Sequence, residues 1–143
     1  MQQVVKTSMH MKRLVIYILM LVMNMGFALA QSQADIKFDK TTHDFGAFSE
    51  KNATVTTTFT FTNVGDGPLV IHQAIASCGC TVPEYTLEPV QPGKTGTIKV
   101  TYNGKGRFPG KFKKSITVRT NAKTELVRLF IEGEMLADAG SEE

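Results

Sequence analysis

Apolar and polar side chains alternate along several short segments of the chain. In Thr54–Asn63, TVTTTFTFTN, the side chains of Val55, Phe59 and Phe61 share one face and a row of threonines occupies the other. Alternation with a period of two, in β-branched and aromatic residues, is typical of a strand with one buried face. The same pattern recurs in Thr97–Tyr102, in Lys111–Thr120 and from Val127 to Ile131, and the short apolar segments Ile36–Phe38 and Leu69–Ile71 add two further candidate strands.

Turn-forming residues separate these segments. The clusters are Asn63–Pro68 (NVGDGP), Pro92–Lys94, Asn103-Gly104 and Pro109-Gly110, and they combine residues that adopt positive φ with residues that fix φ near −65°. No helical period is sustained after residue 30. The pattern predicts an all-β fold, an immunoglobulin-like β-sandwich of about seven short antiparallel strands. We expect one domain over residues 31–135, followed by a frayed acidic tail over residues 136–143.

The first 30 residues have the composition of a secretory signal peptide. An apolar run over residues 14–30, LVIYILMLVMNMGFALA, follows Lys12-Arg13 and ends in the small-residue pattern Ala28-Leu29-Ala30. A basic start, an apolar stretch and this ending together mark a cleavable export signal. An uncleaved anchor is the alternative, because about 17 apolar residues is the lower limit for a membrane span. We expect cleavage after Ala30, with Met11 as an alternative translation start.

Export would place the protein in the periplasm or outside the cell, and cleavage would leave it without an integral membrane segment. It would also change the charge. The chain has 16 Lys and Arg against 13 Asp and Glu, and three of the basic residues but none of the acidic ones lie in the leader. The remainder is therefore balanced in charge, which gives no support to nucleic-acid binding, because that requires a sustained positive field.

Basic residues are nevertheless concentrated in one part of the chain. No acidic residue occurs from Pro89 to Ala122, and the strand pattern places Lys99, Lys111, Lys113 and Arg119 toward solvent. One interpretation is a basic face that attracts anionic envelope components such as lipid headgroups or acidic glycans. The alternative, which we favour, is that the lysines protect an exposed strand edge from unwanted pairing.

The only two cysteines, Cys78 and Cys80, are separated by Gly79 in the segment SCGCT. A disulfide between them would close a very short loop and add little stability by restricting the unfolded chain, and Gly79 suits a tight or positive-φ backbone. Four interpretations stay open: a tight turn with free or intermittently oxidised thiols, which we favour, a disulfide, a soft-metal site, and thiol redox chemistry. For the metal, His72 is the candidate third ligand and His43 a further one.

Catalytic patterns are missing from the sequence after residue 30. That part has only two histidines, His43 and His72, and it has no nucleophile motif, zinc-protease motif or glycine-rich loop opening a helix. Asp35, Asp39, Asp44 and Glu50 are scattered and are interpreted as solvated surface positions. We therefore expect a protein that is not an enzyme and that requires no cofactor.

Several motifs in this order resemble those of the DUF1573 family. They are HDFGAF (His43 to Phe48), FTNVGDGPLVI (Phe61 to Ile71), SCGCT (Ser77 to Thr81), PGKTGTIKVTYN (Pro92 to Asn103), GKFKKSITVRTNA (Gly110 to Ala122) and LFIEGEM (Leu129 to Met135). The resemblance implies an exported bacterial protein, of a kind frequent in Bacteroidetes, with an immunoglobulin-like fold similar to the ASPM/SPD-2/Hydin modules. It implies no reaction.

Two functional hypotheses follow. In the first, the protein is a non-enzymatic module that contacts an unknown protein or envelope polymer through a sheet face or a strand edge. In the second, it is a protein of soft-metal or thiol-redox chemistry centred on Cys78 and Cys80.

Overall fold

The computed structural model describes residues 2–23 and 32–138, which belong to two separate compact units. In the first unit, α1 (Gln2–Met23) is a helix of 22 residues. No helix among the described residues combines the length and the apolar character needed to cross a membrane. The expected cleavage point after Ala30 lies outside the described residues, so the signal peptide stays a prediction.

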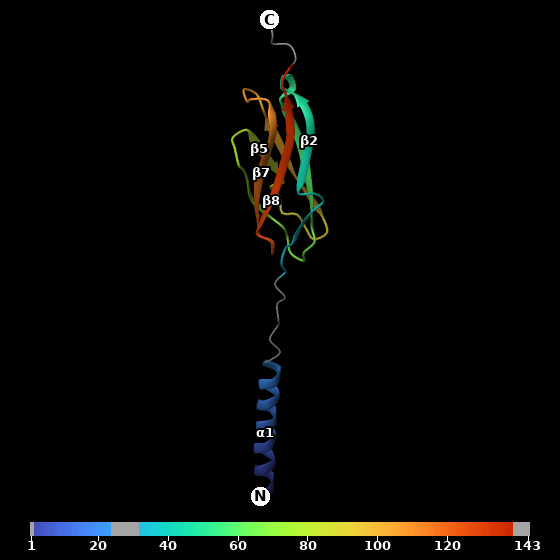
Figure 1. Cartoon of the computed structure of the whole chain (residues 1–143). Helices are drawn as coiled ribbons and strands as arrows, with labels where there is room; N and C mark the ends of the chain where they lie inside the picture. The colour runs from blue at the N-terminus through green and yellow to red at the C-terminus, as the bar shows by residue number, and fades with distance from the viewer. Residues whose placement is uncertain (1, 24–31, 139–143) are drawn as a thin grey trace. The chain divides into compact units, whose positions relative to one another are not determined.

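The second unit consists of two four-stranded sheets packed face to face (Figure 1). One sheet has the order β1-β3-β6-β5 and the other β2-β8-β7-β4. This confirms the predicted β-sandwich. The strands are β1 (Ile36–Phe38), β2 (Thr42–Ser49), β3 (Thr54–Asn63), β4 (Ile71–Ala76), β5 (Thr81–Tyr85), β6 (Thr95–Asn103), β7 (Gly110–Thr120) and β8 (Leu126–Leu136), with a 3₁₀ turn at Glu50–Asn52.

The expectation of purely antiparallel pairing is wrong for one pair of strands. β2 runs parallel to β8, whereas every other paired strand is antiparallel within the described residues. The cause is a change of sheet early in the chain, because β1 pairs with β3 in one sheet and β2 continues in the other. β2 therefore lies beside β8, the last strand, and runs in the same direction. The described residues contain eight strands, one more than the approximate number predicted.

The core lies between the two sheets. Its largest members, with no exposed surface, come from β3, β6, β7 and β8 and from the segment before β4: Phe59, Phe61, Ile98, Val100, Ile116, Val118, Leu129, Ile131 and Leu69. These are the residues that the alternation assigned to the buried faces of four strands, together with Leu69 from a short apolar run. All buried members of the core cluster lie between Ala34 and Ile131. The sandwich therefore holds a hydrophobic core built from its own strands and loops.

The predicted strand at Leu69–Ile71 is wrong. Leu69 forms only an isolated bridge to Val90, in which each residue's N–H donates to the other's carbonyl, and β4 begins at Ile71. The apolar run reflects complete burial of Leu69, not a strand. The alternation predicted no strand at residues 42–49, 72–76 or 81–85, because bulges and a proline interrupt it there.

The chain's ordered structure reaches beyond the expected start of the acidic tail. Leu136 is still part of β8, and the Asp138 carboxylate accepts a hydrogen bond from the Ser49 hydroxyl at 2.7 Å and lies 3.6 Å from the Lys51 ammonium. The backbone N–H of Asp138 also donates to the Glu50 carboxylate at 3.0 Å. β8 and these contacts thus extend past residue 135, the expected end of the domain, as far as Asp138.

The other end of the sandwich holds the start of the domain in place. Val64 N–H donates to Asp35 O and Asp66 N–H donates to Gln33 O, both at 3.0 Å. A Cβ at Gly65 would fall within 3 Å of the backbone of residues 33–35. The glycine allows this close approach, so the turn that the sequence indicated also packs against the first residues of the domain.

Candidate functional site

The cysteine turn lies where the chain passes from one sheet to the other. β4 ends one sheet at Ala76 and β5 begins in the other at Thr81, so residues 77–80 form the crossing. Ser77 N–H donates to the Ser115 carbonyl on β7 at 2.8 Å, and Asn103 N–H, at the end of β6, donates to the Cys80 carbonyl at 2.8 Å. The turn is thus attached to a neighbouring strand of each sheet.

Cys78 and Cys80 are joined by a disulfide, with their Cα atoms 5.2 Å apart. The pair is therefore oxidised in this structure, as in the disulfide interpretation, and it lies in the tight turn that the favoured interpretation expected. Cys80 is buried at 4% exposure and belongs to the core, and Cys78 packs against it while remaining half-buried. Gly79 does not have positive φ, and a Cβ there would meet no atom within 4 Å. The glycine is required neither by the backbone angle nor by packing.

The two histidines do not join the cysteines. His72 is an exposed residue of β4, and its carbonyl accepts a hydrogen bond from the Tyr85 hydroxyl at 3.3 Å. Among residues 2–23 and 32–138, no group of three or more His, Cys, Asp or Glu side chains is placed to hold a metal ion. The ligand set proposed from the sequence, Cys78, Cys80 and His72, is therefore not assembled.

His43 has local partners on and next to β2. Its Nδ1 accepts a hydrogen bond from the Lys40 ammonium at 2.9 Å, and its ring packs edge-on against Phe45 with centroids 4.7 Å apart. Burial and the nearby Lys40 charge lower the pKa of His43 below its usual 6.5, while Asp44 acts in the opposite direction. The lowered pKa favours the neutral form of the His43 imidazole, and the two contacts indicate a local structural role for this side chain.

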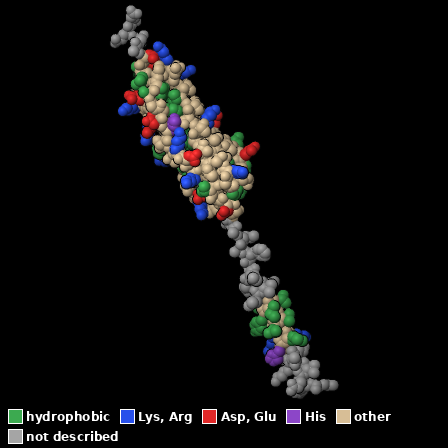
Figure 2. Space-filling model, turned by 90° about the vertical axis from the view of Figure 1, so that its right-hand side faces the viewer, with side chains coloured by type: hydrophobic (Ala, Val, Ile, Leu, Met, Phe, Trp, Pro, Cys, Tyr) green, Lys and Arg blue, Asp and Glu red, His purple; other side chains and the backbone are tan. Residues whose placement is uncertain are grey.

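The four residues of the expected basic face point to solvent but do not form one face. Lys99 lies on β6 in one sheet, whereas Lys111, Lys113 and Arg119 lie on β7 in the other. Two of them are also neutralised by cross-strand partners: Lys99 by Glu84 and Lys113 by Glu132, each at 2.9 Å. Acidic and basic side chains are interspersed on the surface shown in Figure 2. The expected concentration of positive charge is divided between opposite sides of the sandwich.

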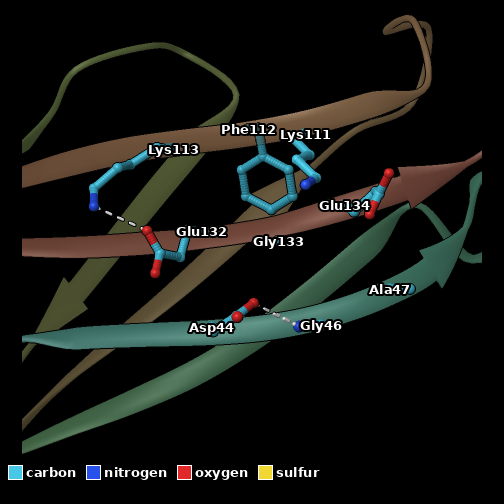
Figure 3. A pocket seen from close by; sticks show the side chains of 9 residues that line it. All are labelled: Asp44, Gly46, Ala47, Lys111, Phe112, Lys113, Glu132, Gly133 and Glu134. Atoms are coloured by element: carbon cyan, nitrogen blue, oxygen red, sulfur yellow. Dashed lines mark hydrogen bonds and ion pairs between the residues drawn. The ribbon is translucent and has the colours of Figure 1, made fainter.

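A groove of about 550 Å³ lies over β2, β8 and β7 (Figure 3). We call it the β2–β8–β7 groove, and its lining residues are Asp44, Gly46, Ala47, Lys111, Phe112, Lys113, Glu132, Gly133 and Glu134. Its volume lies within the range of small-molecule sites. The sequence gives no indication of this site, because its residues come from three segments that only the sheet brings together.

Two glycines, on β2 and β8, are part of the lining of the groove. Gly46 lies in a β-bulge between Asp44 and Ala47, has φ +66°, and donates its N–H to the Asp44 carboxylate at 2.8 Å. A Cβ on Gly133 would lie 3.1 Å from the Gly46 carbonyl oxygen and 3.2 Å from the ring of Phe112. Glycine is therefore favoured at both positions, and the floor of the groove is backbone with an aromatic ring beside it. In the sequence, the HDFGAF and IEGE segments each show only an isolated glycine, which does not reveal that the two positions meet.

Some charged side chains of the groove form an ion pair, whereas others form none within the described residues. The Lys113–Glu132 pair lies at one end, and the Lys113 ammonium also lies 5.3 Å from the centroid of the Phe130 ring. Lys111 and Glu134 lie at the other end and are register partners across β7 and β8, but they form no ion pair within the described residues. One end of the groove thus offers a cation and an anion to a ligand.

The family model described as "Protein of unknown function (DUF1573)" matches residues 36–135. The chain belongs to the DUF1573 family. This confirms the family expected from the motifs, and the match covers the whole sandwich from β1 to the end of the buried part of β8. No curated protein matches the chain.

Solved structures similar to this DUF1573 chain share its fold. A protein of unknown function from Porphyromonas gingivalis W83 has a TM-score of 0.63 and 18% identity, covering 78% of this chain and 51% of that protein. The PapD-like domain 7 of human CEP192 has a TM-score of 0.58 and 10% identity, covering 74% and 88%. The secreted serine protease VesC from Vibrio cholerae has a TM-score of 0.50 and 15% identity, covering 79% and 25%. The DUF1573 chain spans about half the length of the Porphyromonas protein.

All four outer strands of the DUF1573 sandwich carry features that hinder the addition of another strand. β1 has only three residues, and β5 has Pro83 at its centre. β2 has the bulge between Asp44 and Ala47, and the pairing of β4 with β7 shifts near Ile71. Short edges, prolines and bulges are the means by which sheets avoid edge pairing. The sheet faces are therefore better suited to binding than the edges.

Proposed function

We propose that this DUF1573 protein is an exported, non-enzymatic immunoglobulin-like module of the cell envelope that binds a protein or an envelope polymer through the β2–β8–β7 groove. The observation that carries the proposal is the groove itself, which has a glycine floor and an unpaired Lys111 and Glu134 at one end. The features that hinder pairing at all four sheet edges favour binding through this face over addition of a strand.

The chemistry of the lining indicates what kind of segment fits. Lys111 can bind a carboxylate or phosphate, and Glu134 can bind an ammonium or an amide N–H. A glycine floor lets a backbone or a sugar ring approach the sheet closely. The groove therefore suits a short polar segment that carries both donors and acceptors, such as part of a peptide.

The carboxylates of the groove support a binding role over a catalytic one. Asp44 and Glu132 are register partners on β2 and β8, which places two acids side by side. Each is already engaged, Asp44 with the Gly46 N–H and Glu132 with Lys113. An acid–base pair needs one group free to take a proton and another free to give one. The lining also includes no Ser, Cys or His that would act as a nucleophile.

Export is supported by the leader sequence, and oxidation of the cysteine pair is compatible with a non-reducing compartment. We expect the protein purified from the cell envelope to begin at Gln31. Mass spectrometry of the exported protein measures this, and a mature species that retains residues 11–30 would contradict it.

Filling the groove tests the binding site directly. Ala47 is exposed on β2 at the groove, so Ala47→Tyr places a large ring in it, whereas Thr58→Tyr places the same ring on the outer face of the other sheet. We expect wild type and Thr58→Tyr to capture the same component of an envelope extract, and Ala47→Tyr to lose it by tenfold or more, which is about 1.4 kcal/mol.

The charged end of the groove provides a second readout. Lys111→Gln and Glu134→Gln should each weaken the same capture, and their effect should diminish in high salt, because exposed charges are screened. Equal capture by wild type and Ala47→Tyr would show that the groove is not the binding site.

A further inference from the structure

The β6–β7 loop, residues 104–109 with the sequence GKGRFP, is a projection with a fixed base. Gly104 N–H donates to the Ala53 carbonyl at 2.8 Å, and Arg107 N–H donates back to the Gly104 carbonyl at 3.0 Å. A Cβ on Gly104 would lie 2.8 Å from Met135 Sδ, so the base of the loop is packed against β8. The residues beyond this base turn through Gly106, which has φ +72°. The loop therefore displays its tip on an ordered support.

The tip exposes an aromatic side chain almost completely. Phe108 is 97% exposed, whereas Phe59 and Phe61 of the core are 0% exposed. Leu136, which follows the Met135 residue paired with Gly110 at the base of the loop, is 47% exposed. Two large apolar side chains at the same end of the sandwich are thus exposed, Phe108 almost completely and Leu136 by about half.

Cations flank this aromatic residue. Lys105 and Arg107 are exposed, and neither forms an ion pair within the described part of the chain. Lys111 follows directly at the start of β7. Of the basic residues between positions 89 and 122, two on the strands are paired with glutamates, whereas those of the loop remain available.

Acidic groups also lie at this end, but two of them are occupied. The Asp138 carboxylate contacts Ser49 and Lys51, and the Glu50 carboxylate accepts the Asp138 N–H. Glu134, opposite Lys111, is the one that faces the groove. The positive charge at the tip itself is therefore not cancelled by a direct partner.

We propose that the β6–β7 loop is a contact site for an anionic phospholipid surface, in which Phe108 enters the headgroup region and Lys105, Arg107 and Lys111 face the lipid phosphates. An aromatic ring is well accommodated at a membrane interface, and each nearby cation adds attraction to an anionic leaflet. A protein partner fits less well, because binding hot spots are surrounded by a ring of packed contacts, whereas Phe108 is flanked by a cation, a proline and glycines. This site shares only Lys111 with the β2–β8–β7 groove, and its aromatic tip and its other two cations lie outside the groove lining.

Vesicle co-sedimentation tests the inference with residues 31–143, which hold the complete core. The vesicles consist of phosphatidylcholine alone or of equal parts phosphatidylcholine and phosphatidylglycerol. We expect binding to the phosphatidylglycerol vesicles only, and its loss in about 0.5 M salt, where the field of the cations is screened. Phe108→Ser should weaken binding by about tenfold or more, the loss expected for one large apolar side chain. Arg107→Gln should weaken it by about fivefold.

Leu87→Ser is the matched control. Leu87 is 79% exposed in the loop that precedes β6, so it lies at the opposite end of that strand from Phe108. Its replacement should leave vesicle binding unchanged, as should the groove variant Ala47→Tyr. Absence of binding by wild type, equal binding by Phe108→Ser, or an equal loss in Leu87→Ser would each overturn the inference. Capture of a protein that depends on Phe108 without vesicle binding would assign the loop to a protein partner instead.

Discussion

Replacement of Asn63 by alanine should be among the most destabilising single changes to a polar residue of this domain. The Asn63 side chain is 0% exposed; its Nδ2 donates to the Gly67 and Val90 carbonyls at 2.7 and 2.8 Å, and its Oδ1 accepts the Gly65 N–H at 3.0 Å. Without it, the Val90 carbonyl still accepts from Leu69 N–H. The Gly65 N–H and Gly67 carbonyl lose the side-chain partner that Asn63 provides.

The magnitude follows from these two groups. An unsatisfied buried polar group costs about 1–3 kcal/mol, and Gly65 is only half-buried, so we expect a loss of about 2–4 kcal/mol in the free energy of unfolding. In a domain of this size that corresponds to a fall in Tm of roughly 10–20 °C. Urea unfolding followed by circular dichroism measures the change.

Asn103 supplies a matched control. Like Asn63 it ends a strand, and its Oδ1 accepts the N–H of the residue two positions later, Lys105, at the same distance of 3.0 Å. It is exposed, and within the described residues its Nδ2 makes no hydrogen bond that compares with those of Asn63. Asn103→Ala should therefore cost less than about 1 kcal/mol. If the two variants differ by less than about 0.5 kcal/mol, the buried amide does not carry the stability assigned to it.

Three further predictions concern other parts of the domain. Gly96→Ala should lower the free energy of unfolding by about 1–3 kcal/mol, because a methyl group there would overlap the buried ring of Phe61, its pairing partner on β3. Gly79→Ala, the control, faces open space and should change the free energy of unfolding by less than about 0.5 kcal/mol; denaturant titrations measure both. The His43 ring should titrate below pH 6.5 by NMR, so the stability that it contributes is present above pH 6.5 and is lost as the pH falls through its lowered pKa. Lys40→Gln should raise the pKa of His43, and an unchanged titration midpoint in that variant would contradict the pairing of Lys40 with His43. Because the cysteines form a disulfide, the oxidised domain should take up no iodoacetamide when it is unfolded without reductant. Because no third ligand lies near them among the described residues, it should bind neither Zn(II) nor Cu(I) stoichiometrically, and one equivalent of tightly bound metal would restore the metal hypothesis.

The alternation along the chain determined the class of fold and much of the core. Val55, Phe59 and Phe61 on β3 face inward with threonines opposite, because a strand with one buried face must alternate and the pairing register leaves no freedom to rotate it. The turn clusters likewise marked where strands end. These features are local, so sequence alone was sufficient, and the order of the motifs was sufficient for the family.

The pairing of distant segments was decided only by the tertiary structure. Lys99 and Lys113 have the same outward pattern in the sequence, yet they lie on different sheets and each meets a glutamate from another strand. Gly46 and Gly133, which both line the groove, meet because β2 lies parallel to β8, a pairing that no local pattern specifies. Periodicity fixes which side of a strand is buried, but which strands become neighbours is set by how two sheets close over one core, and that placed the charges and the groove.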